Sequence, residues 1–462
     1  MTRRLRSRTL AATLLPLLVS GCAAAGKNYV RPAVAIPVSY RCGALVQAES
    51  QADAPWWAIF TDATLQELVR EALEHNLDVQ AAVARIEQAR AQAGIAKSFL
   101  YPQVDASAAY TLQQNITKSD DDVRHGGTYG FQLSWELDLF GRIRREREAA
   151  VARLIASEHG RRGVLVTLVG DVTSTYFLIR QLDLQLAIAR QTLATNDATV
   201  TYFRNRLDGG VSNKLELDRI VANREVTAAS IPNFEQQIAI AENALSILLA
   251  RVPGPIERDS SASDMLLPDI PPSLPATLLG RRPDVLQAEQ LLIAANADAG
   301  AAKALFFPAI SLSSFGGAIS GDVATLLGGA GGVWTATPSL LQPIFNAGRL
   351  RNNLEGARAR VDEAVAEYRK SALNGYREVS DALVTIRKLA DVRLHQQEGV
   401  VALQDAAELS RARYESGLAS YIEILTADQQ LFAEQLQLAE TRGAEFRARS
   451  ELYRALGGGW QP

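Results

Sequence analysis

The chain of 462 residues repeats itself at an offset of about 206 residues. Three segments recur in the same order, and chance would not keep both their order and their spacing. The matching pairs are "DVQAAVARIEQARAQAGIAKSFLYPQV" (78–104) with "DVLQAEQLLIAANADAGAAKALFFPAI" (284–310), "GRIR" (141–144) with "GRLR" (348–351), and "RNRLDGGVSNKLEL" (204–217) with "RARYESGLASYIEI" (411–424). Because the offset is far longer than a solenoid repeat, each copy should contain several helices and strands. The predicted repeats span residues 62–252 and 276–457, with a Pro- and Ser-rich linker (253–275) between them and a short tail (458–462).

The sequences of the two repeats predict the same order of elements. A helix of some twenty residues ends before a proline and is followed by two strands, one very long helix, a glycine-containing turn and a second helix. The first long helix has apolar residues at a spacing of three and four, which is typical of a coiled coil. Its main seam is Leu165, Val172, Ile179, Leu186 and Leu193. The predicted strands are about 103–114, 128–139, 308–320 and 332–344, and the predicted long helices are about 141–206, 214–250, 348–414 and 420–456.

The predicted strands alternate apolar and polar residues, most clearly in "YGFQLSWELDLFG" (129–141). Alternation gives a strand one apolar and one polar face, and ten to twelve residues suffice for a tilted transmembrane strand. A soluble sheet packed on the helices is the alternative. Four strands cannot close a barrel, whereas two chains would supply eight strands and three would supply twelve, with room for water. In the larger barrel, Glu136 and Asp138 would face the lumen.

The N-terminal residues 1–21 are typical of a signal peptide. An arginine-rich start, "MTRRLRSR", precedes a short apolar run, "TLAATLLPLLV", and then "VSGC", which ends at Cys22. This pattern resembles a bacterial lipoprotein signal, so Cys22 is predicted to be acylated and residues 22–61 to form a lipidated N-terminal segment. An ordinary secretory signal with an incidental cysteine is the alternative. With Cys22 acylated, Cys42 is the remaining thiol, so the fold should not depend on an internal disulfide. A Cys22–Cys42 bridge in a protein without lipid is the alternative.

The chain has 48 basic and 51 acidic residues. This balance argues against a nucleic-acid-binding protein, which usually has a basic patch. The four histidines are far apart in sequence and show no metal-ligand spacing. We found no phosphate-binding loop and no nucleophile elbow. The sequence therefore predicts no enzymatic activity, no cofactor and no metal site.

Several segments together resemble the outer-membrane factor (TolC-like) family, in the lipoprotein branch that serves efflux pumps. They are "PWWAIFTDATLQELVREALEHNLDV" (55–79), "LLGRRPDVLQAE" (278–289), "YESGLASYIEIL" (414–425) and "LYRALGGGW" (452–460). The resemblance implies a mixed, mainly α fold in a homotrimer. Its parts would be a twelve-stranded transmembrane β-barrel with four strands from each chain, a long α-helical coiled-coil periplasmic barrel and an α/β equatorial region.

The resemblance also implies a role and partners. The chain would be the outer-membrane channel component of a tripartite efflux system, a lipid-anchored, passive conduit for drugs, toxic organic compounds or metal ions. Its partners would be two further copies of itself, a periplasmic adaptor protein, an inner-membrane transporter of the resistance-nodulation-division type and outer-membrane lipid. A type I protein-secretion outlet of the same architecture and a non-pore structural lipoprotein are the alternatives, and the sequence does not name the substrate.

The functional residues that the resemblance implies lie at the two glycine turns. The expected tip and adaptor contacts are Gly210, Val211, Ser212, Gly417, Leu418 and Ser420. The expected gate residues are Glu216, Tyr414, Glu423 and Asp428: Glu216 and Tyr414 match a pair that bonds across neighbouring hairpins, and Glu423 matches an acid that narrows the opening. The family's next acid is replaced here by Thr426, with Asp428 nearby. The alternative for Glu216 and Glu423 is a solvated helix face, and "RIRREREAA" (142–150) is expected to be a solvated helix start.

Overall fold

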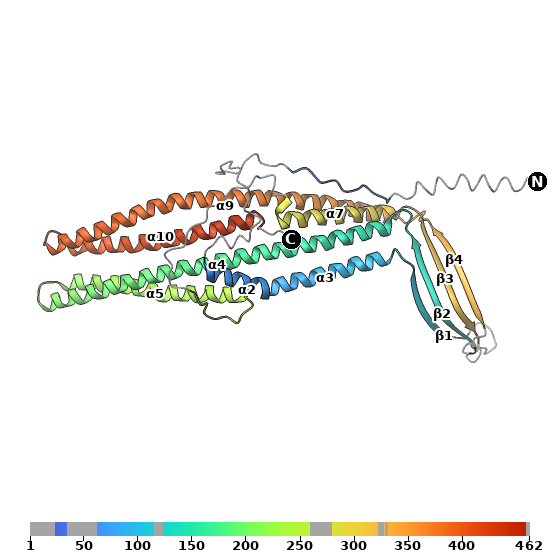
Figure 1. Ribbon diagram of the computed structural model, residues 1–462, viewed down its shortest axis with the longest axis horizontal. Coiled ribbons are helices and arrows are strands. Elements are labelled where there is room, and N and C mark those ends of the chain that lie inside the picture. Colours follow the sequence, from blue (N-terminus) through green and yellow to red (C-terminus); the bar gives the residue numbers. More distant parts are fainter. Residues whose placement is uncertain are drawn as a thin grey trace, which may run out of the picture. The chain divides into compact units, whose positions relative to one another are not determined.

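The computed structural model describes residues 24–34, 62–114, 123–258, 280–321, 328 and 331–458. Long helices and a four-stranded sheet make up this part of the chain (Figure 1). The elements are α2 (Ala63–His75), α3 (Leu77–Ser98), β1 (Gln103–Gln114), β2 (Val123–Leu137), α4 (Arg142–Asp208), α5 (Lys214–Leu248), α7 (Pro283–Ala304), β3 (Ala309–Ser320), β4 (Gly332–Leu341), α9 (Arg349–Glu415) and α10 (Tyr421–Ala455).

Most element bounds lie within two residues of those expected from the sequence. The larger differences concern two strands: β2 begins at Val123 rather than at about 128, and β4 ends at Leu341 rather than at about 344. The signal segment, Cys22 and Cys42 lie outside the described residues, as do most of the linker and most of the tail.

The described chain divides into two compact units that both draw on both repeats. Unit 1 draws on residues 1–33, 84–159 and 287–370, and unit 2 on residues 34–83, 160–286 and 371–462. The boundaries between the units fall inside α3, α4, α7 and α9. A compact unit therefore does not correspond to one repeat, because the longest helices extend through both units.

Unit 1 contains the sheet, whose strands lie side by side in the order β1-β2-β3-β4, all antiparallel (Figure 1). Directly paired residues point to the same face of a sheet. Val104 pairs with Leu133, Leu133 with Ser314, and Ser314 with Ala336. The same register brings one set of residues, nearly all of them apolar or small, to this face: Ala106, Tyr129, Phe131, Trp135, Ile310, Leu312, Trp334, Pro338 and Leu340.

The opposite face of the sheet is mainly polar, with Gln132, Glu136, Ser313 and Thr335 among its residues. Two glycines, Gly130 and Gly317, are paired on this face and let the strands and the Phe315 ring approach closely. A Cβ atom on Gly130 would lie 2.5 Å from the Gly316 carbonyl oxygen and 3.0 Å from Cε2 of Phe315. The ring therefore lies over the glycine pair.

An extended N-terminal segment, residues 24–31, packs on the helices of unit 1, and we call it the strap. The Ala25 amide donates to the Phe140 carbonyl (2.9 Å), and Asn296 Nδ2 on α7 donates to the Lys27 carbonyl (3.0 Å). Gly26 has a φ of +97°, and a Cβ atom there would meet Gly300 Cα at 2.7 Å. Glycine at both positions is what allows the strap to lie directly on α7.

Farther along the strap, Tyr29 and Arg31 both bond the carboxylate of Glu289. The Tyr29 hydroxyl donates to Oε1 of Glu289 at 3.1 Å, and Arg31 Nε donates to the same atom at 2.6 Å. Glu289 is buried, so these bonds fix the strap through a desolvated carboxylate.

Unit 2 is helical, and two antiparallel hairpins account for most of it: α4 with α5, and α9 with α10 (Figure 1). Both turns close in the same way. Gly210 has a φ of +71° and Gly417 a φ of +76°. The next amides, those of Val211 and Leu418, donate back into the last helical turn, which is a Schellman motif. Glycine is needed there because the left-handed conformation strains other residues.

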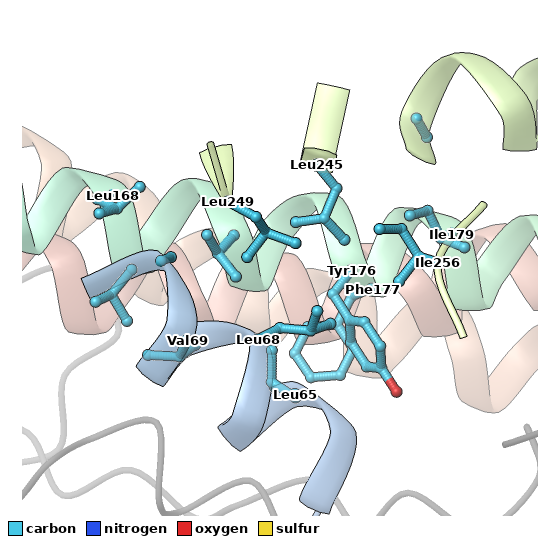
Figure 2. Packing of buried hydrophobic residues seen from close by; sticks show 14 of the residues in the cluster. Leu65, Leu68, Val69, Leu168, Tyr176, Phe177, Ile179, Leu245, Leu249 and Ile256 are labelled. Carbon is cyan, nitrogen blue, oxygen red and sulfur yellow. The ribbon is translucent and has the colours of Figure 1, made fainter. Parts of the chain in front are cut away.

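The largest core of unit 2 forms where α2 packs against α4, α5 and α10 (Figure 2). Tyr176 and Phe177 lie at its centre, and the Phe177 ring stacks on Phe446 with centroids 4.7 Å apart. The Tyr176 hydroxyl donates to Asp62, and the other carboxylate oxygen of Asp62 caps α2 by accepting from the Leu65 amide. One aspartate therefore both starts α2 and attaches it to α4.

Candidate functional site

The apolar face of the sheet exposes large side chains to solvent in the isolated chain. Phe131 is 66% exposed and Trp334 is 79% exposed, with Val104, Leu112 and Leu340 similarly uncovered. A contiguous apolar surface of this kind marks contact with another protein or with lipid. The alternation expected from the sequence thus results in a sheet that has one face suited to lipid and one face suited to water.

Glu136 and Asp138 were predicted to face a lumen, and in the structure the two side chains have different surroundings. Glu136 lies on the polar face of the sheet, where its carboxylate forms two bonds to Arg142, of 3.0 and 2.7 Å. Asp138 lies beyond the end of β2, and its side chain is only 9% exposed. Its carboxylate accepts from the amides of Ile143 (3.2 Å) and Arg144 (2.8 Å), which start α4. We therefore propose a lumen position for Glu136, whereas the Asp138 carboxylate is used at the start of α4.

Both glycine turns present exposed apolar residues. Val211 and Leu418 follow the glycines Gly210 and Gly417 and are each well exposed. Ser212 comes one residue after Val211, and Ser420 two residues after Leu418. The Ser212 hydroxyl donates to Glu216 at 2.7 Å, whereas Ser420 is the N-cap residue of α10. The six residues predicted to contact an adaptor therefore lie in two short loops of similar build.

An aromatic cluster joins the ends of the two hairpins. Phe203 on α4 lies 4.4 Å from Tyr421 on α10 and 5.8 Å from Tyr414 on α9, measured between ring centroids. Ile220 on α5 packs against the same group. The Arg206 guanidinium lies over the Tyr414 ring at 5.5 Å, within range of a cation–π interaction. Residues from α4, α5, α9 and α10 therefore pack together close to the two turns.

Glu216 and Tyr414 were predicted to bond across neighbouring hairpins. Within the described part of this chain no hydrogen bond joins the two side chains, and the Glu216 carboxylate accepts from the Ser212 hydroxyl at 2.7 Å. A bond between neighbouring hairpins of the trimer stays a prediction. The Glu216 charge still acts on Tyr414: burial raises the pKa of Tyr414, Arg206 lowers it, and the Glu216 charge raises it further.

The two remaining gate candidates have arginine partners on α9. Glu423 lies 3.7 Å from Arg413, and both side chains are about half exposed, so this ion pair contributes little. Asp428 is largely buried and accepts a 2.7 Å bond from Arg411. Burial raises the pKa of Asp428, and Arg411 offsets only part of that increase. At Thr426, where the family has an acid, the hydroxyl donates to the Ile422 carbonyl at 2.8 Å.

Arg145 is a structural residue that the sequence analysis missed, because "RIRREREAA" (142–150) was expected to be solvated. Its side chain is only 5% exposed. The guanidinium donates to the Ala25 carbonyl (3.2 Å) and to Asn28 Oδ1 (2.8 Å), both on the strap. Ile143 and Ala149 are buried as well. The charge pattern of residues 142–150 does not predict the burial of Arg145, because that burial depends on contact with the strap, which is distant in sequence.

Within the described ranges no group of three or more His, Cys, Asp and Glu side chains is arranged to hold a metal ion. Helix α4 contains an 18-residue window that is long and apolar enough to cross a membrane, with a mean hydropathy of 1.2. In this chain 56% of that window is buried, as in the core helices of soluble proteins, so it is weak evidence for a membrane helix.

A sheet with one apolar and one polar face, together with two long helical hairpins, fits the class of outer-membrane channels. The chain belongs to the outer membrane efflux protein family, whose sequence model matches it twice, over residues 68–251 and 274–458. Each match covers most of one predicted repeat.

Curated relatives are similar over nearly the whole chain. The cation efflux system protein CusC of Escherichia coli K12 is 34% identical over 447 residues, which cover 96% of this chain and 97% of the relative. The probable outer membrane lipoprotein SilC of Salmonella typhimurium has the same identity and coverage. The probable efflux pump outer membrane protein TtgC of Pseudomonas putida is 31% identical over 472 residues, covering 100% of this chain and 96% of the relative.

Solved structures share the fold. A crystal structure of CusC has a TM-score of 0.84 at 33% identity and covers 95% of this chain and all of that one. The open state of the MtrE outer membrane channel of Neisseria gonorrhoeae has a TM-score of 0.85 at 28% identity, over 95% and 98% of the two chains. A membrane protein from Pseudomonas aeruginosa has a TM-score of 0.86 at 32% identity, over 94% and 100%.

The predicted fold class and the predicted role are confirmed. The protein is a trimeric outer-membrane channel in which each chain supplies four strands to a twelve-stranded barrel and long helices to a periplasmic coiled-coil barrel. It is the outer-membrane component of a tripartite efflux pump, working with a periplasmic adaptor and an inner-membrane transporter.

Proposed function

We propose that the channel is a passive conduit rather than an enzyme, that it exports small toxic solutes, and that its inner-membrane partner is of the resistance-nodulation-division type. The observation that carries the conduit in this proposal is the two-faced sheet, because a polar face closed into a barrel lets a solute cross the membrane without entering lipid. The energy for transport then comes from the inner-membrane partner. Acylation at Cys22 anchors the same chain to the outer membrane.

The names of the relatives point to two substrate classes. CusC is named for cation efflux, and a Pseudomonas putida relative of 31% identity is named for toluene efflux. We propose that metal ions and toxic organic compounds are the substrate classes, and that the inner-membrane transporter decides between them.

The test is a deletion of the gene in its own host, with susceptibility measured against metal ions, antibiotics and organic solvents. Loss of resistance to some of these agents, restored by the wild-type chain, supports the proposal. Planar bilayers reconstituted with the purified trimer should show ion conductance, which a non-pore structural lipoprotein would not give. An unchanged susceptibility together with a missing secreted protein would instead identify a type I secretion outlet.

We propose further that the hairpin tips form the gate and the adaptor contact. The supporting observation is the aromatic cluster of Phe203, Tyr414 and Tyr421, which packs both hairpins at the level of the two turns. In a trimer, three copies of Glu423 would lie near the axis, and their like charges would favour cations and oppose closure.

Single-channel recordings test the gate. The double variant Glu216→Ala with Tyr414→Phe should raise conductance by loosening the closed state, whereas Glu423→Gln should mainly weaken cation selectivity and block by multivalent cations. For the adaptor contact, Val211→Asp and Leu418→Asp should abolish pull-down of the adaptor without changing trimer stability. Unchanged conductance and selectivity in correctly inserted trimers would place the gate elsewhere on the helices.

A further inference from the structure

The strap, α7 and α9 line an open cavity of about 370 Å³ in unit 1, and its basic side chains are exposed to solvent. It is distinct from the hairpin tips, which belong to unit 2. Its lining residues come from three stretches far apart in sequence: Gly26 and Lys27 on the strap, Asn296 to Lys303 on α7, and Leu354 to Asp362 on α9. A cavity of this size is in the range that holds a small ligand or the polar part of a larger one.

The strap wall of the cavity is rigidly held. Asn296 Nδ2 fixes the Lys27 carbonyl at 3.0 Å, and on either side of Lys27 the Arg145 guanidinium bonds the Ala25 carbonyl and the Asn28 side chain. The close contact of Gly26 with Gly300 leaves no room for the strap to shift toward α7. The Lys27 side chain therefore starts from a fixed backbone at the rim of the cavity.

The cavity is positively charged. Three of its lining residues are basic, Lys27, Lys303 and Arg358, and one is acidic, Asp362. None of the three basic side chains forms an ion pair with a carboxylate of the described residues, whereas Arg31, Arg142, Arg144, Arg145 and Arg153 in the same unit all do. With three basic residues against one acidic residue, the cavity lining has an excess of two positive charges, which favours an anionic ligand.

The cavity also lies close to the strands that enter the membrane. Lys303 is in the last turn of α7, and β3 begins at Ala309. Arg358 is nine residues into α9, which begins shortly after β4 ends, so it lies on the order of 14 Å along the helix from that start. Lysine and arginine side chains that start below a membrane surface can extend their charged ends toward the headgroup layer.

We propose that this cavity binds the phosphate group of an anionic phospholipid of the inner leaflet. Ammonium and guanidinium donors recognise phosphate oxygens through charge-assisted hydrogen bonds, and basic pockets between membrane-proximal helices bind lipid headgroups in this way. The excess of cations favours a headgroup with net negative charge, such as phosphatidylglycerol, over zwitterionic phosphatidylethanolamine.

The chain supplies a matched control for the test. Lys97 ends α3 in the first repeat as Lys303 ends α7 in the second, and both lie in the last helical turn. Arg360 is exposed on α9 two residues from Arg358 and does not line the cavity. The double variant Lys97→Gln with Arg360→Gln therefore removes the same two charges as Lys303→Gln with Arg358→Gln, at a similar depth and away from the strap.

The experiment is native mass spectrometry of delipidated trimers titrated with phosphatidylglycerol or phosphatidylethanolamine. We expect the wild type and the control to retain about three phosphatidylglycerols per trimer and the cavity variant to bind it about thirtyfold more weakly, given the usual strength of two headgroup contacts. Equal binding of both lipids, or equal loss in the control and the cavity variant, overturns the proposal.

A second arm distinguishes the source of the phosphate. Isothermal titration of the trimer with inorganic phosphate and with glycerol 1-phosphate measures binding without an acyl chain. Binding of phosphatidylglycerol alone supports a lipid site. Tight binding of inorganic phosphate that is lost in the cavity variant retains the phosphate chemistry but replaces the lipid with a soluble ion.

Discussion

At the scale of single residues, two glycines set how closely β2 and β3 approach. A Cβ atom on Gly130 would meet backbone atoms of β3, the Gly316 oxygen at 2.5 Å and Gly317 Cα at 2.7 Å. Backbone cannot rotate away as a side chain can, so Gly130→Val should cost about 1–3 kcal/mol through overpacking. Gly126 is on the same strand and face with nothing within 4 Å, so Gly126→Val is the matched control. Thermal dissociation of the trimer on gels measures both, and equal midpoints would contradict this packing.

Asp428 predicts a pH dependence of the tip. Burial raises its pKa above the ordinary value of 3.8, so the folded state holds the proton more tightly than the unfolded state. The stabilisation is fully present below the unfolded pKa and is lost as the pH rises through the folded pKa. The midpoint of thermal unfolding should therefore fall as the pH rises above about 4, and Asp428→Asn should flatten this part of the curve. If the unfolding midpoint of Asp428→Asn falls with pH as steeply as that of the wild type, another group causes the pH dependence.

At the scale of elements, the two hairpins have similar turns but different caps. The Asn213 side chain accepts from the Glu216 amide at 3.0 Å and caps α5, whereas Ser420 makes no side-chain bond at the start of α10. Asn213→Ala should destabilise the first turn of α5 by about 1 kcal/mol, and Ser420→Ala should have little effect on α10. Hydrogen exchange of the two first turns provides the measurement. A larger effect at Ser420 would show that the cap geometry changes in the assembled channel.

Hairpins and strands could be predicted because their signals are local. Heptad spacing, alternation, glycines at left-handed turns and the repeat itself located them to within a few residues. The end of β2 was placed too late because Asp138 continues the alternation, although its carboxylate is used to start α4. The strap and its partners Arg145 and Glu289 could not be found, because their burial depends on contacts between residues more than a hundred positions apart.

At the scale of the whole molecule, assembly in the membrane depends on which face of the sheet meets lipid. Leu133 lies on the apolar face, and its neighbour Gln132 lies on the polar face. An arginine on the lipid side of such a barrel costs about 2–4 kcal/mol near the bilayer midplane. Leu133→Arg should therefore impair trimer insertion far more than Gln132→Arg, as judged by recovery of heat-resistant trimers from outer membranes. Equal recovery would refute the assigned faces.

Membrane anchoring predicts one more outcome for the whole chain. Cys22→Ser should abolish labelling by a fatty-acid analogue, because the "VSGC" sequence offers the acylation site. Since the barrel itself inserts in the membrane, efflux should weaken rather than disappear, and persistent labelling of the variant would locate the lipid elsewhere.

The order of the strands also predicts which mutant alleles are dominant. Among the strands that the structure describes, β1 and β4 each have one hydrogen-bonded neighbour, so the barrel closes only when β4 of every copy pairs with β1 of the next. A copy whose edge strand cannot pair leaves the entire ring open. In a cell that expresses equal amounts of normal and defective chains that still join the trimer, only about one trimer in eight is wholly normal. An allele that disrupts an edge strand should therefore be dominant, whereas an allele that prevents synthesis of the chain should be recessive.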